Sequence, residues 1–154
     1  MTRRDLGVVG VAILCTLALM PRARSQDTEQ AVMGSTAVDW TRMTATPTKT
    51  GEVRSVFRAP TATLDELEAH ITTLNPGESP HPPHTHPDEE VLFLKEGTLE
   101  ATLNGKTVRV GPGSVLFQAS DQLHSLRNVG TAPATYFVMK WNSPGMLKKK
   151  AIAE

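Results

Sequence analysis

Residues 77–97, GESPHPPHTHPDEEVLFLKEG, decide the fold of this chain and contain its best candidates for functional side chains. Within them His84 and His86 are one residue apart, and Glu90 follows four residues after His86. On an extended segment, residues i and i+2 point to the same side. Two neutral imidazoles and a carboxylate on one side can bind a divalent metal ion. The apolar run 91–94 predicts a strand that anchors this site in a sheet.

A further candidate ligand lies downstream. His124 is followed by Asn128 four residues later, again inside an apolar strand pattern. Three histidines and one glutamate on two strands predict a mononuclear metal centre with nitrogen and oxygen donors, which suits manganese, iron, zinc, nickel or copper. The chain has one cysteine, Cys15, and it lies in a segment that we expect to be removed. A thiolate ligand or nucleophile is therefore not expected in the mature protein.

The first 25 residues have the features of an export signal. A short basic region precedes the apolar run 6–20, which is too short for a comfortable membrane span, and Ala23 and Ser25 are the small residues that a signal peptidase reads. We expect cleavage after Ser25 and a periplasmic or secreted protein with no stable membrane anchor. An uncleaved anchor is the alternative. Residues 2–6, TRRDL, also resemble a twin-arginine signal, so this route and the ordinary secretory route both remain open.

Length and charge indicate one domain and no nucleic-acid partner. The 154 residues contain 16 basic and 16 acidic side chains. Removal of residues 1–25 takes away four arginines and one aspartate and leaves 12 basic against 15 acidic residues, which disfavours binding to nucleic acid. We divide the mature chain into a polar linker at 26–36, a globular domain at 37–145 and a basic tail at 146–154.

The pattern of the domain predicts an all-β fold. Alternating apolar and polar residues with turn signals between them indicate strands at 38–46, 52–58, 67–74, 91–94, 98–103, 106–110, 114–119, 123–129 and 134–141. Asn104-Gly105 is the sequence of a type I′ hairpin turn, in which both central residues have positive φ. A Thr63-x-x-Glu66 capping box supports one helical turn at most. Such a series of short strands is typical of an antiparallel sandwich or barrel.

Two motifs make the chain resemble the cupins. The first cupin motif, Gly-x5-His-x-His-x3–4-Glu-x6-Gly, matches Gly77, His84, His86, Glu90 and Gly97, with one extra residue before the first histidine. The second motif, Gly-x5-Pro-x-Gly-x2-His-x3-Asn, maps onto Gly113, Ala119, Asp121, His124 and Asn128. Alanine replaces the proline, and aspartate replaces a glycine whose left-handed conformation it tolerates. The resemblance covers residues 67–141.

The cupin resemblance implies a small jelly-roll barrel with a metal ion inside, held by His84, His86, Glu90 and His124. We expect one divalent ion per chain, manganese or iron by preference and zinc or nickel as alternatives. Residues 53–90 also look like single-domain relatives of ureidoglycine aminohydrolases. The implied protein is an exported enzyme that acts on a small organic molecule by dioxygenase-type or aminohydrolase-type chemistry. A non-catalytic binding or sensing cupin and a metal-free barrel are the alternatives. The sequence assigns no catalytic residue.

Strand alternation orients the remaining side chains around this site. If Glu90 faces inward, so do Leu92, Leu94, Leu99, Ala101, Leu103 and Leu126, which predicts a mostly apolar cavity. Glu89 then points outward as a surface charge. We expect His81 to be exposed or to gate the site rather than to bind the metal, and His70 to be a surface residue rather than part of the pocket.

The outward side of the central strand is also apolar. Val91 and Phe93 alternate with the inward leucines, and a strand that is apolar on both faces is normally covered on both. The cover would be either the N-terminal segment around Trp40 or a second subunit. We expect a homodimer, which the cupin resemblance also implies.

Overall fold

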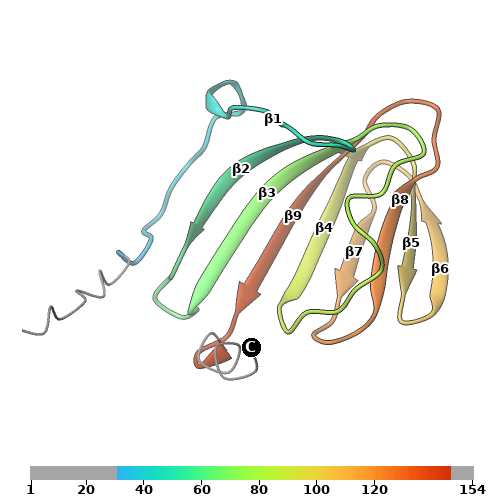
Figure 1. The fold of residues 1–154 in the computed structure, drawn as a ribbon. Coiled ribbons are helices and arrows are strands. Elements are labelled where there is room, and N and C mark those ends of the chain that lie inside the picture. Colours follow the sequence, from blue (N-terminus) through green and yellow to red (C-terminus); the bar gives the residue numbers. More distant parts are fainter. Residues whose placement is uncertain (1–30, 147–154) are drawn as a thin grey trace, which may run out of the picture.

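The computed structural model describes residues 31–146, which form an all-β fold of two antiparallel sheets (Figure 1). The expected signal segment and nearly all of the basic tail lie outside these residues. The larger sheet has the strand order β1-β2-β3-β9-β4-β7 and the smaller one β6-β5-β8. The described strands are β1 (Thr46–Pro47), β2 (Gly51–Ala59), β3 (Glu66–Leu74), β4 (Glu89–Glu96), β5 (Leu99–Leu103), β6 (Lys106–Val110), β7 (Val115–Gln118), β8 (His124–Asn128) and β9 (Ala134–Asn142).

Two turn predictions are confirmed by the backbone. Asn104 and Gly105, between β5 and β6, have φ values of 46° and 81°, as a type I′ hairpin requires. Asp121 has a φ of 58°, so this aspartate does adopt the left-handed conformation of the glycine that it replaces. Both turns lead into strands of the smaller sheet, and the second brings the chain to His124 at the start of β8.

The core lies between the two sheets. Both sheets contribute buried side chains to one cluster: Leu74, Leu92, Leu94, Leu99, Ala101, Leu116, Leu126, Ala134, Tyr136 and Val138. Leu103 packs against this cluster. The predicted inward direction of the leucines on β4 and β5 is therefore confirmed, and Glu90 shares their face because it precedes Leu92 by two residues.

The N-terminal part of the domain differs from its prediction. Instead of a strand at 38–46, the chain forms a 3-10 helix at Trp40–Arg42, followed by the short strand β1. The Asp39 carboxylate accepts a hydrogen bond from the Thr41 backbone N–H at 2.8 Å, which caps this helical turn. In β2, a bulge between Ser55 and Phe57 shifts the register, so that Phe57 lies on the same face as Arg54. No helix forms at the capping box, where β3 begins.

The outer face of the larger sheet is apolar across five strands. Cross-strand partners share a face, and the register places two rows there: Arg54, Ile71, Phe137, Phe93 and Val115, and Phe57, Ala69, Met139, Val91 and Phe117. At the β4–β7 end of this face Phe93 is 44 % exposed, Val115 64 % and Phe117 52 %. The predicted outward direction of Phe93 is therefore confirmed, and its side chain is not covered by the described residues.

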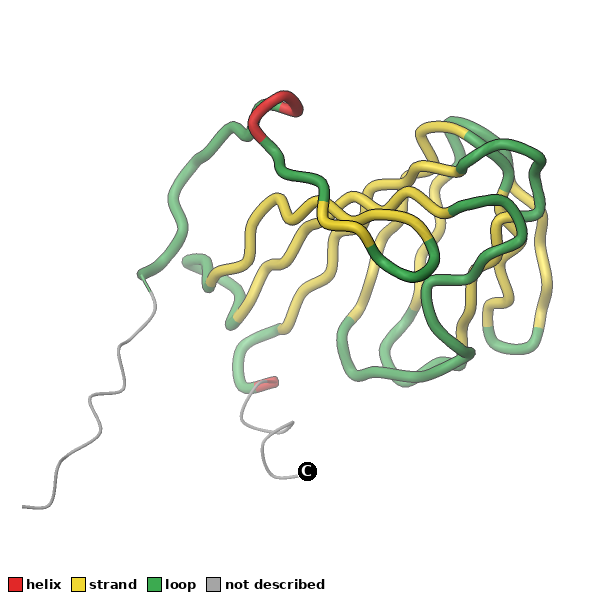
Figure 2. The backbone as a smooth tube through the Cα atoms, turned by 45° about the horizontal axis from the view of Figure 1, so that its top comes forward, coloured by secondary structure: helices red, strands yellow, loops and turns green. Residues whose placement is uncertain are grey.

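The N-terminal segment covers only one end of this outer face. The helical turn, red in Figure 2, lies outside the two sheets. The Trp40 ring lies 4.9 Å from the Arg54 guanidinium and 4.7 Å from the Lys95 ammonium, which are cation–π contacts. Trp40 itself remains 43% exposed. Among the described residues, no helix has the length and apolar character needed to cross a membrane.

The loop between β3 and β4 runs alongside β8 and so brings the two sequence motifs together (Figure 1). The Gly77 N–H donates to the Asn128 carbonyl at 2.9 Å. Further along, His84 and His124 exchange backbone hydrogen bonds of 3.1 Å and 3.0 Å, and the Asp121 N–H donates to the His86 carbonyl at 2.8 Å. Four prolines between residues 80 and 87 lack the N–H that a regular ladder needs, so the loop is joined to β8 by separate hydrogen bonds, which also include the 2.9 Å bond from the Asn128 N–H to the Glu78 carbonyl.

Candidate metal centre

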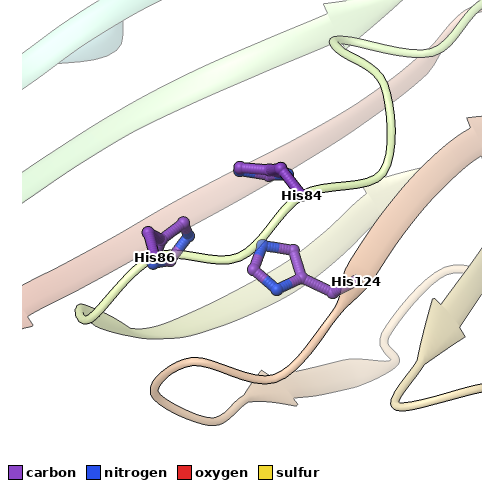
Figure 3. A group of neighbouring side chains, drawn as sticks. All are labelled: His84, His86 and His124. Carbon is purple, nitrogen blue, oxygen red and sulfur yellow. The ribbon is translucent and has the colours of Figure 1, made fainter.

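Three of the four predicted ligands converge in the structure. His84 and His86 come from the β3–β4 loop and His124 is the first residue of β8, and Figure 3 shows the three rings gathered together. One ring nitrogen from each lies within 4.8 Å of the others. Nitrogens that bind one ion at about 2.1 Å, at tetrahedral or octahedral angles, lie roughly 3.0–3.4 Å apart, so the group would contract by at most roughly 1.8 Å around an ion.

Hydrogen bonds to the backbone set two of the ring tautomers. His86 Nδ1 donates to the Asp88 carbonyl at 3.0 Å, and His124 Nδ1 donates to the Gln122 carbonyl at 2.8 Å. A carbonyl only accepts, so Nδ1 carries the proton in both rings and Nε2 keeps its lone pair. Such outer contacts orient histidines that bind metals. The turn that follows β7 therefore both places His124 and fixes its protonation.

Unpaired buried nitrogens indicate that a group belongs between these rings. His84 Nδ1 and His124 Nε2 are buried and have no hydrogen-bond partner among the described residues. An unpaired buried polar atom costs about 1–3 kcal/mol, and a metal ion would satisfy both atoms at once. The donor set and the spacing of these nitrogens thus fit a divalent transition metal.

Glu90 lies beside the three histidines rather than within their close group. Its Oε2 is 3.7 Å from His86 Nε2. On the sheet it stands between Lys140 of β9 and Gln118 of β7, its register partners on either side. Burial raises the pKa of Glu90, partly offset by the charge of Lys140.

Two of the three histidines are kept neutral, which is the form that binds a metal ion. Burial and the neighbouring rings of His81, His124 and His86 together lower the pKa of His84 to about 4. Burial and the proximity of His124 also hold the pKa of His86 below its usual value, against the opposing effect of Asp88. At neutral pH both rings therefore present lone pairs rather than charges.

The group opens onto a cavity of about 250 Å³ between the sheets. The three histidines and Glu90 form one wall, and the other lining residues are His70, Thr72, Pro80, His81, Gln118, Leu126, Tyr136, Val138 and Lys140. The prediction of a mostly apolar cavity is therefore wrong. The inward leucines of β4 fill the core below the site, whereas the end of the barrel that holds the histidines carries polar side chains from β3, β7 and β9.

A family comparison agrees with this arrangement. The model of the cupin domain matches residues 70–140, a range that contains all four predicted ligands and both sequence motifs. Within this range the chain is similar to the cupin domain. Among curated protein sequences, no significant match to this chain was found.

Solved cupin structures have the same fold at low sequence identity. The cupin domain of Cnp3 from Schizosaccharomyces pombe superposes with a TM-score of 0.60 at 14% identity and covers 75% of this chain and 80% of its own. A predicted oxalate decarboxylase from Thermotoga maritima superposes with a TM-score of 0.57 at 21% identity, and the match covers 70% of this chain and 99% of that protein. The polyketide cyclase RemF from Streptomyces resistomycificus superposes with a TM-score of 0.55 at 20% identity, and the match covers 72% of this chain and 82% of that protein. At these identities the similarity concerns the fold.

The other residues of the cupin motifs have structural roles. Asn128 is fully buried and donates to the Leu74 and Ala132 carbonyls at 3.0 Å and 2.9 Å, so it ties β8 to the ends of two neighbouring segments. Gly97 has a φ of 92°, and a Cβ there would lie 2.5 Å from the Cα of Ala134. Only glycine therefore allows the chain to leave β4 so close to β9.

The sequence prediction for His70 is wrong. The side chain lines the metal cavity, and its Nδ1 is 2.7 Å from Glu68 Oε1. Lys140 Nζ lies 3.4 Å from Glu68 Oε2. Burial raises the pKa of Glu68, but the hydrogen bond and charge of His70 and the charge of Lys140 outweigh it and leave the pKa below its usual value. The signal was present in the sequence, because Glu68 and His70 alternate in phase with the buried Leu74.

Two other expectations concern residues beside the site. His81 is exposed, lines the cavity, and lies with its ring centroid 4.0 Å from that of His84, which fits an entrance position. It is not part of the close nitrogen group. Glu89 points away from the cavity, as predicted, and accepts a hydrogen bond from the Trp141 indole N–H at 3.1 Å.

Proposed function

We propose that the protein is an exported, metal-dependent cupin enzyme that acts on a small organic molecule. One observation carries the proposal: one ring nitrogen from each of three histidines lies within 4.8 Å of the others at the wall of a cavity, and His84 and His124 each have a buried ring nitrogen without a hydrogen-bond partner among the described residues. His84, His86, His124 and Glu90 would hold one divalent ion, manganese or iron by preference and zinc or nickel as alternatives. Such an ion supplies a Lewis acid with positions open to the cavity.

The size and lining of the cavity support a small polar substrate. Liquid water occupies about 30 Å³ per molecule, so the cavity of about 250 Å³ equals roughly eight waters. The chain contributes donors and acceptors around this space, including Thr72, Gln118 and Lys140, which would orient the bound molecule. The reaction would be of the dioxygenase type, or of the aminohydrolase type that the resemblance to ureidoglycine aminohydrolases implies.

Elemental analysis is the first test of this function. The protein is purified without chelators, and we expect close to one equivalent of a transition metal per chain. His84→Ala and His124→Ala should each lower the occupancy sharply, whereas His81→Ala should not. Less than about a tenth of an equivalent in the wild type would refute the metal centre. Oxygen uptake and ammonia release, followed over a panel of small substrates, would then separate the two reaction types.

A non-catalytic cupin that binds or senses a small molecule is the second candidate. The cavity has room for a ligand and polar groups to recognise it whether or not a reaction follows. Binding of a ligand to the metal-loaded protein without its conversion would favour this candidate over the enzyme.

We also propose that the chain is exported and cleaved after Ser25. The support is the order of a basic region, an apolar run and small residues at the cleavage position. N-terminal sequencing of protein from the periplasm should begin at or near Gln26. A mature chain that begins at Met1 or Thr2 would exclude cleavage.

We further propose that a second copy of the chain covers the outer face of the larger sheet and makes the protein a homodimer. The two apolar rows remain exposed at Phe93, Val115 and Phe117. A two-fold copy of the same apolar face is complementary to it.

A further inference from the structure

A second polar cluster lies across the cavity from the three histidines. His70 and Glu68 are on β3, and their side chains share the inward face with Lys140 of β9. Glu68, Lys140 and Glu90 are register partners on three adjacent strands. Strands lie about 4.8 Å apart, so Glu68 stands roughly 10 Å from Glu90. A small molecule at the histidine wall would therefore extend toward His70.

The contacts of His70 define which nitrogen is available. The Glu68 carboxylate is an acceptor, so Nδ1 carries the ring proton in the 2.7 Å hydrogen bond. Among the described residues, no group hydrogen-bonds to Nε2 of His70, and the side chain retains 25% of its exposure while that of Glu68 retains 13%. A neutral imidazole held in this way has its lone pair on Nε2. A buried carboxylate behind it stabilises the imidazolium once a proton arrives.

We propose that His70, oriented by Glu68, is the proton acceptor of the metal cavity. A weakly acidic small molecule, with an O–H group next to a second oxygen, would give its proton to His70 Nε2 as it binds at the three histidines. This inference rests on the proposed metal-dependent function, because the anion needs a positive ion to retain it.

The transfer conserves charge within the cavity. The O–H bond of the acid breaks and its electron pair stays on the oxygen, while the proton forms an N–H bond at His70 Nε2. The neutral acid and neutral imidazole become an anion at the metal wall and an imidazolium beside the Glu68 carboxylate. No net charge enters a partly buried site, which avoids the cost of bringing in an unpaired anion. Lys140 keeps Glu68 ionised from the other side, with Nζ at 3.4 Å.

Proton counting on ligand binding tests the proposal without turnover. The mature protein is loaded with Co²⁺, and acetohydroxamic acid, which is protonated near neutral pH and binds metals as its anion, is the probe. Calorimetry in buffers of different ionisation enthalpy gives the number of protons released to the solvent. We expect the wild type to release close to none, because His70 retains the proton, and His70→Gln to release about one per site.

Two controls separate this role from a structural one. Acetate is already ionised, so its binding should release the same number of protons from the wild type and from His70→Gln. Glu68→Gln keeps the His70 ring but removes the charge behind it, and should raise the release of protons toward one. Circular dichroism and the cobalt content of each variant confirm that the fold and the metal site remain.

The results separate this proposal from the proposed function. Equal proton release by the wild type and His70→Gln, with cobalt bound in both, overturns the role of His70 and leaves the metal centre standing. Failure of acetohydroxamic acid to bind the cobalt-loaded wild type overturns it too. Failure of the wild type to take up cobalt refutes the metal centre itself, and the inference falls with it.

Discussion

Replacement of His124 by alanine should abolish most of the stabilisation that a metal ion gives to the fold. An ion that binds only the native state, at a free concentration of 100 times its dissociation constant, stabilises the protein by about 2.7 kcal/mol. For a domain of this size, 1 kcal/mol corresponds to roughly 4 °C in melting temperature. The wild type should therefore melt about 10 °C higher with metal than without it.

The structure indicates why His124 dominates this effect. The side chain is 3% exposed, its Nδ1 is held by the Gln122 carbonyl, and its Nε2 is unpaired and close to the other two rings. Even loss of a residue that only supports a ligand weakens metal binding about 10–100-fold. A 100-fold loss at the same metal concentration leaves about 0.4 kcal/mol of stabilisation, or roughly 2 °C.

Thermal unfolding of each variant with and without metal measures this difference. His124→Ala also removes packing and one hydrogen bond, but these losses occur with and without metal and so cancel in the comparison. His81→Ala is the matched control, because this ring lies beside His84 yet outside the close group of nitrogens. A full metal-induced shift in His124→Ala, or its loss in His81→Ala, would show that the ion is held elsewhere.

Three further predictions test the barrel, its outer face and its protonation. Leu92→Lys places an unpaired charge in the core at a cost of several kcal/mol, and a folded, metal-loaded variant would contradict the inward direction of β4. Phe117→Glu should yield monomers in light scattering, whereas Val108→Glu, at an exposed site on β6, should not. Metal-free protein should lose stability as the pH falls from 6.5 to about 4, because unfolded His84 binds a proton that the folded ring excludes. Urea denaturation should show a loss of at most roughly 3 kcal/mol in the free energy of unfolding, and solvent access reduces this loss. A free energy of unfolding that does not change with pH in this range would refute the prediction.

Local patterns predicted the barrel well wherever a strand faces the core on one side. On β4 and β5 the alternation of apolar residues placed Leu92 and Leu99 inside, and the Asn104-Gly105 turn joined β5 to β6 as expected. The pattern failed at 38–46, because the alternation there is not matched by a neighbouring long strand. A hydrogen bond from the Thr41 N–H to the Asp39 carboxylate was enough to favour a helical turn.

The candidate ligands were also predictable, since residue type and spacing limit what can bind a metal. His84, His86, Glu90 and His124 stand at the spacings of two cupin motifs, and three of them meet in the structure. Glu90 shows the limit of this reasoning. Its spacing fits the motif, but its position beside His86 rather than within the close group depends on packing against β7 and β9.

The sequence alone determined the all-β class, the positions of most strands and the candidate metal ligands, because each depends on a short period or on a fixed local spacing. The tertiary structure decided which side chains surround the candidate ligands. The pairing of β3 with β9 and of β9 with β4 turned His70, Lys140 and Glu90 into walls of one cavity, although 70 residues separate His70 from Lys140 in the chain. Alternation tells which residues share a strand face, but only the strand order tells which faces meet.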